Sequence, residues 1–258
     1  MKFEIITLFP DYFSLSLKQS LVGKAWENGL FEIEIINLRD YATDKHRTVD
    51  DTPYGGGGGM VMMVEPLDRC LAAKGHSRKG KGSTGRKSHI ILTTAAGHSF
   101  DQRRAIEYSL SEKLTIICGH YLGVDERILD LYDIEEVSIG DYVLSGGEPA
   151  AAVMVDAVAR LLPNVLGNFQ SALEDSFMNQ LLGAPVYTKP PVYEGFKVPE
   201  VLLSGNHAEI RRARLKEAIR KCRDRRPDLL ENPDLSDEEL KIIDEVAKEI
   251  NDSGENNK

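Results

Sequence analysis

Short apolar runs, separated by stretches with helical periodicity, recur along the first half of this 258-residue chain. The runs at 3–9 and 31–38 read as strands because they are rich in β-branched and aromatic side chains. The runs at 89–94 and 114–118 are typical of parallel strands covered on both faces. Helices are predicted between these runs, at 11–28, 67–73 and 100–110. Strands that alternate with helices imply an α/β domain with a mainly parallel sheet.

The rest of the chain is predicted to be mostly helical. Apolar residues at helical spacing predict a long helix over 148–162, which Pro163 ends. The segment that follows, 164–175, has no clear apolar period and reads as a linker. Further on, Asn206 and Ser236 each offer an N-cap with a Glu three residues later, which predicts two more helices. We therefore expect an α/β domain over 1–163, a flexible linker over 164–175 and a helical domain over 176–258.

Charge is unevenly distributed in this chain, whose net charge is −9. Residues 228–258 hold eleven acidic and three basic residues, so most of the negative charge lies there. In contrast, 211–226 holds nine Lys or Arg against two acids, and 74–87 holds six with no acid. Such basic clusters can bind phosphates whatever the total charge. A solvated helix face is the alternative explanation, and composition favours neither.

The cysteines and the apolar runs narrow the class of protein. Cys70, Cys118 and Cys222 lie far apart with no Cys-x-x-Cys spacing, which argues against a structural zinc site or a disulfide framework. No apolar run reaches the ~18 residues of a membrane span, and no signal-peptide pattern opens the chain. We expect a soluble cytoplasmic protein with no membrane partner and no metal site of its own.

A glycine-rich stretch at 75–85 imitates two nucleotide-binding motifs. GKGSTG (80–85) matches the dinucleotide fingerprint, but it follows a predicted helix and precedes a strand, the reverse of what that motif requires. GHSRKGKG (75–82) nearly spells a P-loop but has Gly82 where Ser or Thr must bind magnesium. We interpret the stretch as a mobile basic surface loop, with a nucleotide hydrolase as the disfavoured alternative.

Three other glycine-rich segments point to a ligand. DDTPYGGGGGM (50–60) contains five consecutive glycines, whose entropy cost suggests close approach to a ligand or a partner chain. CGHYLGVDERI (118–128) and SIGDYVLSGGE (138–148) each follow a predicted strand, and ligands of α/β sheets bind at the carboxyl ends of strands. Glycines around the apolar trio 142–144 suit an adenosine pocket, although other small ligands fit this pattern equally well.

Six segments of the chain occur in one order and spacing. They are LFP (8–10), HRTVDDTPYGGGGGM, CGHYLGVDERI, SIGDYVLSGGE, EDSF (174–177) and YTKPPVYEGFKVPEVLLSGNHAEI (187–210). Together they resemble the bacterial tRNA (guanine-N1)-methyltransferases of the SPOUT class over nearly the whole chain. The resemblance implies a parallel sheet with a deep trefoil knot, a small all-α C-terminal domain, and a homodimer whose active sites use both chains.

The resemblance also implies an activity and the residues that perform it. The enzyme would transfer a methyl group from S-adenosylmethionine to N1 of the guanosine at position 37 of tRNA, 3′ of the anticodon, with magnesium as a possible cofactor. Asp175 would be the general base and Arg160 its catalytic partner, although from the residues alone they read as a helix N-cap and a surface ion pair with Asp156. The basic segment 211–226 would hold tRNA phosphates. The methyl donor would contact Thr93, Ala95, Gly97, Gly119, Tyr121, Ser138, Ile139, Gly140, Asp141, Tyr142, Val143, Leu144, Gly146 and Gly147.

The chain departs from the family pattern at a few positions. Leu122 stands where Glu is common, which removes a carboxylate beside the expected donor. Ala95 and Ala96 replace Pro-Gln in the first donor loop, and Ala213 replaces a frequent aromatic residue. These changes keep one alternative open, namely a catalytically weakened homologue that binds RNA.

Overall fold

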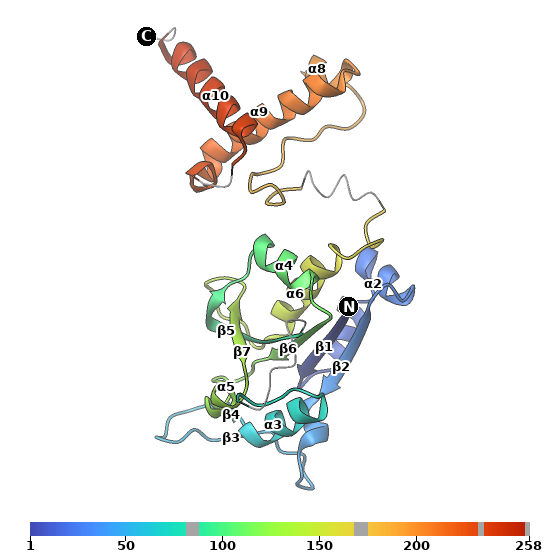
Figure 1. Ribbon diagram of the computed structural model, residues 1–258, viewed down its shortest axis with the longest axis vertical. Coiled ribbons are helices and arrows are strands. Elements are labelled where there is room, and N and C mark those ends of the chain that lie inside the picture. The colour runs from blue at the N-terminus through green and yellow to red at the C-terminus, as the bar shows by residue number, and fades with distance from the viewer. Residues whose placement is uncertain (81–87, 168–174, 232–234, 256–258) are drawn as a thin grey trace. The chain divides into compact units, whose positions relative to one another are not determined.

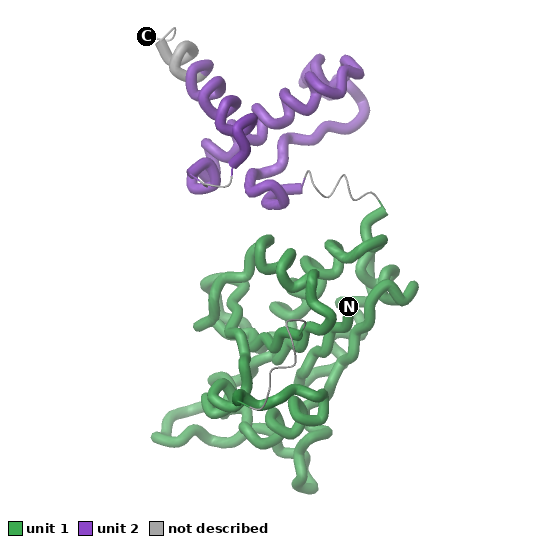
Figure 2. Tube along the Cα trace, viewed as in Figure 1, with its two compact units in different colours: residues 1–167 green, residues 168–258 purple. Residues whose placement is uncertain are grey.

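The protein divides into two compact units, 1–167 and 168–258 (Figure 2). The computed structural model describes residues 1–80, 88–167, 175–231 and 235–255. The boundary between the units lies inside the segment 164–175 that is predicted as a linker. Its first residues belong to unit 1, since Val165 is 4% exposed and packs into the core of that unit. The predicted flexibility mainly concerns 168–174, which lie outside the described residues.

Unit 1 is built on a five-stranded parallel sheet with the strand order β2-β1-β6-β5-β7 (Figure 1). The strands are β1 (Lys2–Thr7), β2 (Glu32–Asn37), β5 (Ser88–Ser99), β6 (Lys113–Cys118) and β7 (Ile134–Ser138). The predicted α/β class with a parallel sheet is confirmed, and the four apolar runs coincide with β1, β2, β5 and β6. Strand β5 continues past its run to Ser99 because an irregularity between Thr93 and His98 lets it rejoin β7.

Helices cover both faces of this sheet. On one face lie α1 (Asp11–Ser16), α2 (Ser20–Glu27), α4 (Gln102–Ser109) and α6 (Glu148–Ala159); on the other lie the 3₁₀ helix η1 (Leu38–Tyr41), α3 (Val64–Ala73) and α5 (Arg127–Leu131). Successive strand residues supply the two cores, because side chains alternate across a sheet. Ile5 and Ile116 pack in the first core, whereas Ile6 and Ile117 pack in the second.

The single helix predicted over 11–28 is wrong, because the chain forms α1 and α2 with a break between them. Ser20 has a φ of +62°, in the left-handed region that interrupts a right-handed helix. Gly23 then allows the backbone to fold closely, since a Cβ there would collide with the carbonyl group of Lys18. The break is therefore a tertiary feature that the apolar periodicity does not record.

The described part of the basic stretch 74–87 is held against unit 1, in contrast to the predicted mobile loop. The Nε of Arg78 donates to Asp68 Oδ1 at 3.0 Å, and Lys79 Nζ donates to the carbonyl of Leu129 at 2.7 Å. These two cations already have partners within the protein. Residues 81–87, which include most of the GKGSTG motif, lie outside the described residues.

Unit 2 consists mainly of helices. They are α8 (Glu200–Leu203), α9 (His207–Arg225), the 3₁₀ helix η2 (Pro227–Glu231) and α10 (Asp237–Glu255). Both predicted N-caps are confirmed: Asn206 accepts from two backbone N–H groups of α9, and Ser236 and Glu239 bond reciprocally at the start of α10. No helix within the described ranges has the length and apolar character that crossing a membrane requires.

The expectation that unit 2 is all-α needs a correction. A two-stranded antiparallel hairpin pairs β8 (Val192–Tyr193) with β9 (Phe196–Lys197). Its turn residues, Glu194 and Gly195, both have positive φ, as the tight turns favoured between antiparallel strands require. The strands are only two residues long, so the sequence offers no alternating run that would predict them.

Candidate functional site

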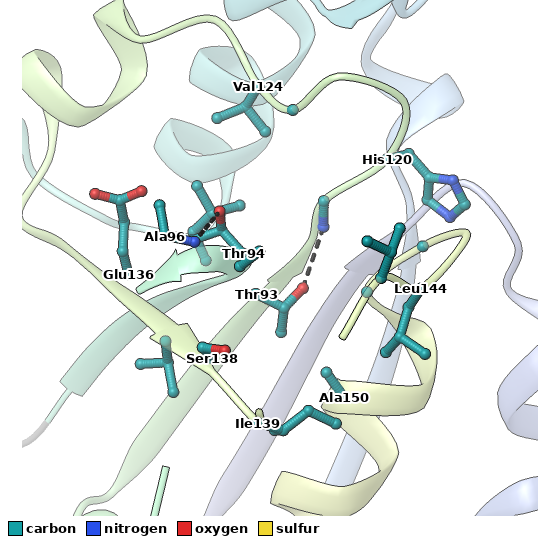
Figure 3. A pocket seen from close by; sticks show the side chains of 18 of the residues that line it. Thr93, Thr94, Ala96, His120, Val124, Glu136, Ser138, Ile139, Leu144 and Ala150 are labelled. Atoms are coloured by element: carbon teal, nitrogen blue, oxygen red, sulfur yellow. Dashed lines mark hydrogen bonds between the residues drawn. The ribbon is translucent and has the colours of Figure 1, made fainter. Parts of the chain in front are cut away.

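A cavity of about 400 Å³ lies at the carboxyl ends of β5, β6 and β7 (Figure 3). The three loops that follow these strands form most of its wall, and Ala150 of α6 completes it. Its volume falls in the range of small-molecule and cofactor sites, and its place in the sheet is where α/β proteins bind ligands. The lining residues are Leu92–Ala96, Gly119–Val124, Glu126, Leu129, Glu136–Gly140, Tyr142–Gly147 and Ala150.

Close backbone approach holds the three loops together. Thr93 Oγ1 donates to the carbonyl of Ile117 at 3.1 Å and accepts from the N–H of Gly119 at 3.2 Å. The N–H of Gly147 donates to the carbonyl of Gly119 at 2.8 Å. A Cβ on Gly147 would collide with Thr93 Oγ1 and lie 2.8 Å from the nitrogen of Gly119. The third loop can therefore pass along the first two only because residue 147 has no side chain.

The five-glycine loop packs against the loop that follows β6. It joins the short antiparallel strands β3 (Asp50–Asp51) and β4 (Val61–Met62). The N–H of Leu122 donates to the carbonyl of Met60, and the N–H of Met62 donates to that of Gly123, both at 3.0 Å. A Cβ on Gly59 would lie 3.0 Å from Leu122 Cγ. At Gly59 the loop approaches another loop of the same chain, whereas the predicted approach to a ligand or a partner chain stays a prediction.

The structure brings together most of the residues expected to contact a methyl donor. Of the fourteen, Gly97 and Asp141 do not line the cavity, whereas the other twelve do. Gly97 has a different role, since a Cβ there would collide with the backbone nitrogen of Val137 and lie 2.6 Å from the carbonyl oxygen of Glu136. It allows β5 to approach β7 beside the cavity.

Several lining residues were not predicted individually. His120, Val124 and Glu126 lie within the motif 118–128, so the motif itself was the signal for them. Glu136 and Val137 belong to the end of β7 and precede the motif 138–148. Figure 3 shows Glu136 near Thr94 and Ala96, and His120 on the side of Leu144. Nothing in the local pattern distinguished Glu136 from an ordinary strand residue.

The carboxylates of the site differ in their engagement. Asp125 accepts from the Nε of Arg127 at 2.8 Å and from its backbone N–H at 3.0 Å. The side chain of Arg127 thereby holds the pKa of Asp125 below its usual value. Asp125 does not line the cavity, whereas Glu126 and Glu136 do. No group of three His, Cys, Asp or Glu side chains within the described part of the chain could hold a metal ion.

Comparison with known proteins assigns the chain to a family. The family model described as tRNA (Guanine-1)-methyltransferase TrmD matches residues 1–232. The chain belongs to this family. It is 48% identical to a tRNA (guanine-N(1)-)-methyltransferase of Limosilactobacillus fermentum, over 97% of this chain and 98% of that protein. Enzymes of the same name from Brevibacillus brevis (49% identical, 96% and 99% covered) and Dehalococcoides mccartyi (46% identical, 98% and 100% covered) are also similar.

The two residues that the family resemblance marks as catalytic lie in different units. Arg160 is the C-cap of α6 in unit 1, and it is not among the residues that line the cavity. Asp175 opens the described part of unit 2 and is partly buried. Their roles in the chemistry of the tRNA (guanine-1)-methyltransferase family therefore remain predictions for this chain.

Three of the four departures from the family pattern lie at the cavity, whereas Ala213 lies on α9 of unit 2. Ala95 and Ala96 line it within the irregular part of β5, and Leu122 lines it from the second loop. Leu122 is 63% exposed, so it is not a core residue. Asp125 does not line the cavity, so Glu126 is the lining carboxylate nearest in sequence to the one that Leu122 replaces.

Proposed function

We propose that this protein transfers a methyl group from S-adenosylmethionine to N1 of the guanosine at position 37 in tRNA. Family membership over residues 1–232 supports the reaction class and its methyl donor. The observation that carries the proposal is the three-loop cavity at the carboxyl ends of β5, β6 and β7. Twelve of the fourteen residues that the family resemblance assigns to the donor line this cavity.

The proposed chemistry divides between the donor and this chain's own side chains. The sulfonium of the bound donor supplies the methyl group. N1 of guanine carries a proton and is a poor nucleophile, so Asp175 acts as the general base that removes it. The negative charge that develops toward O6 is stabilised by the guanidinium of Arg160. No step is assigned to magnesium, because the described residues offer it no cluster of ligands.

An assay on tRNA transcripts tests this function. The full chain, given radiolabelled donor, is expected to label a transcript with G37 and to leave its A37 counterpart unlabelled, and digestion should release 1-methylguanosine. Equal labelling of both transcripts would contradict the assignment of the base. Labelling only in single turnovers with excess enzyme would favour the catalytically weakened homologue, which the absence of a carboxylate at Leu122 suggests.

We further propose the deep trefoil knot of the SPOUT class for unit 1. Its support is the close passage of the third loop along the first two, at Gly147, Thr93 and Gly119. We also propose that the segment 164–175 links the knotted domain to the tRNA-binding unit 2, with Val165 at its start packed into the core of unit 1.

A homodimer is proposed on the basis of an exposed apolar surface. Helices α1 and α6 pack against each other, and they expose Leu15 (74%), Val153 (49%) and Tyr12 (42%). Contiguous apolar side chains at a surface mark an interaction site. Sedimentation of the full chain should show a dimer, and Leu15→Asp combined with Val153→Asp should shift it to monomer. An active wild-type monomer at assay concentration would contradict the proposal.

The tRNA is proposed to bind exposed arginines near the two ends of α9. Three of its cations are ion-paired with α10: Arg212 with Glu245, and Lys216 and Arg220 with Glu249. The basic segment 211–226 is therefore not available as a whole. Arg211, Arg223 and Arg225 are exposed and form no ion pair with another residue of the described ranges. These three arginines are the ones we assign to tRNA phosphates.

Arg223→Ala combined with Arg225→Ala should weaken tRNA binding and flatten its salt dependence. Each lost phosphate contact lowers the slope of log K against log salt by about 0.7 to 0.9. Filter binding across a salt series measures both quantities. Arg212→Ala is the matched control, since its guanidinium already bonds Glu245 and should contribute less. An equal loss in the control would show that the ion pairs with α10 do not decide which arginines bind tRNA.

A further inference from the structure

A buried polar chain joins three separate segments of unit 1 beside the cavity. Glu148, at the first residue of α6, is 3% exposed. Its Oε1 accepts from Thr7 Oγ1 at 2.5 Å, and its Oε2 lies 2.7 Å from Nε2 of His120. Thr7 Oγ1 in turn accepts from the N–H of Phe9 at 2.9 Å. The chain thus connects the end of β1, the loop after β6 and the start of α6.

The surroundings of His120 hold its ring in one place. Its side chain is only 11% exposed, and the ring of Phe9 packs on it with the centroids 5.0 Å apart. Residue 120 also bridges to Gly146 in the third loop, and a Cβ on Gly146 would collide with His120 Nε2. The imidazole therefore occupies space that only a glycine leaves open.

The next residue along the loop shows why this anchor matters. Tyr121 has a φ of +60°, a conformation that L side chains rarely adopt and that the surrounding structure must enforce. Both Tyr121 and His120 line the cavity, whereas Thr7 does not. A buried carboxylate needs hydrogen-bond partners, and Glu148 also benefits from its place in the first turn of α6, where the helix dipole favours negative charge. A carboxylate accepts hydrogen bonds, and the Nε2 of His120 lies at donor distance from it.

We propose that Thr7, Glu148 and His120 form a positioning triad that presets the second and third loops for the methyl donor. The triad takes no part in proton transfer. It acts on donor binding, because its bonds hold the loop turn at Tyr121 and the passage of Gly146 in the shape that the cavity requires. The inference rests on the proposed donor site.

The test uses Thr7, the member that lies outside the cavity. Thr7→Val keeps the shape of the side chain but removes the hydroxyl that bonds the buried carboxylate. Thr7→Ser keeps the hydroxyl. In calorimetric titrations of the full chain with S-adenosylhomocysteine, Thr7→Val should raise the Kd by about 10-fold. Thr7→Ser should restore it to within about 2-fold of wild type, because the hydrogen bond is kept. In steady state, Thr7→Val should raise the KM for the donor with little change in kcat, the pattern of lost uniform binding.

A matched control separates positioning from general stability. Thr115, on β6, is also fully buried and donates from its Oγ1 to a buried carboxylate, that of Glu4, at 2.9 Å. Thr115→Val should lower the midpoint of thermal unfolding as much as Thr7→Val does. Its Kd for S-adenosylhomocysteine should nevertheless stay at the wild-type value. If Thr7→Val does not fold, the pair His120→Ala and His120→Gln replaces it, and the Gln amide should recover binding that Ala loses.

The outcomes are distinct. Wild-type affinity in Thr7→Val, an equal loss in Thr115→Val, or a fall in kcat alone would overturn the positioning triad while leaving the proposed function intact. Failure of the wild-type chain to bind S-adenosylhomocysteine would overturn the donor site, and the triad with it.

Discussion

Asp175→Asn is expected to lower the rate of methyl transfer by a factor of about 10² to 10⁴, the usual cost of losing a general base. The amide cannot accept the N1 proton, so methyl transfer should slow. Because the amide is nearly isosteric with the carboxylate, the donor should still bind normally. Single-turnover transfer to a G37 transcript measures the rate, and titration with S-adenosylhomocysteine measures donor binding.

The control for this variant is Asp244→Asn, which changes an exposed carboxylate on α10 of the same unit. It should transfer methyl groups at the wild-type rate. Near-normal turnover by Asp175→Asn would mean that another group removes the N1 proton. A large loss of donor affinity in that variant would instead assign Asp175 to the binding of the donor.

Gly97→Ala is expected to lower the free energy of unfolding by about 1 to 3 kcal/mol, as overpacking typically does. The new methyl group would meet the backbone of Val137 and Glu136, which cannot rotate away as a side chain can. The same shift would disturb the irregular part of β5 that carries Ala95 and Ala96, so the affinity for S-adenosylhomocysteine should fall as well.

Gly58→Ala provides the matched comparison. A Cβ on Gly58 meets nothing within 4 Å, and its φ is not in the left-handed region. This variant should be as stable as wild type or slightly more so, since alanine restricts the unfolded chain. Denaturant unfolding of both variants decides the matter. Equal stabilities would show that β5 and β7 can separate at Gly97 without cost.

The sheet and the cavity were predictable because their signals are local. Continuous apolar runs mark buried parallel strands wherever they occur, and the motif 118–128 follows β6 directly. The break before Ser20 was missed because the break depends on a close approach between Lys18 and Gly23, which periodicity does not encode.

Contacts between residues that lie far apart in the sequence were the other feature that could not be predicted. Thr7 and Glu148 are 141 positions apart, so nothing in the local sequence indicates that they bond. Likewise, Arg220 forms an ion pair with Glu249, 29 positions away. This pair neutralises part of the basic segment that the sequence predicts as a phosphate site. Gly97 was predicted to contact the donor, but it lies against β7 and does not line the cavity, because a glycine kept for a ligand and one kept for a neighbouring strand look the same in sequence.

The place of β1 between β2 and β6 in the sheet has a consequence for how the chain is made. Residues 2–6 pair on one side with β2, but on the other side with residues 113–117 of β6. At a synthesis rate of about 5 to 20 residues per second, roughly 5 to 20 s separate the emergence of these two strands from the ribosome. During that interval one edge of β1 has no partner, and unpaired apolar edges promote aggregation. The nascent chain therefore depends on protection of its first strand until β6 has been synthesised.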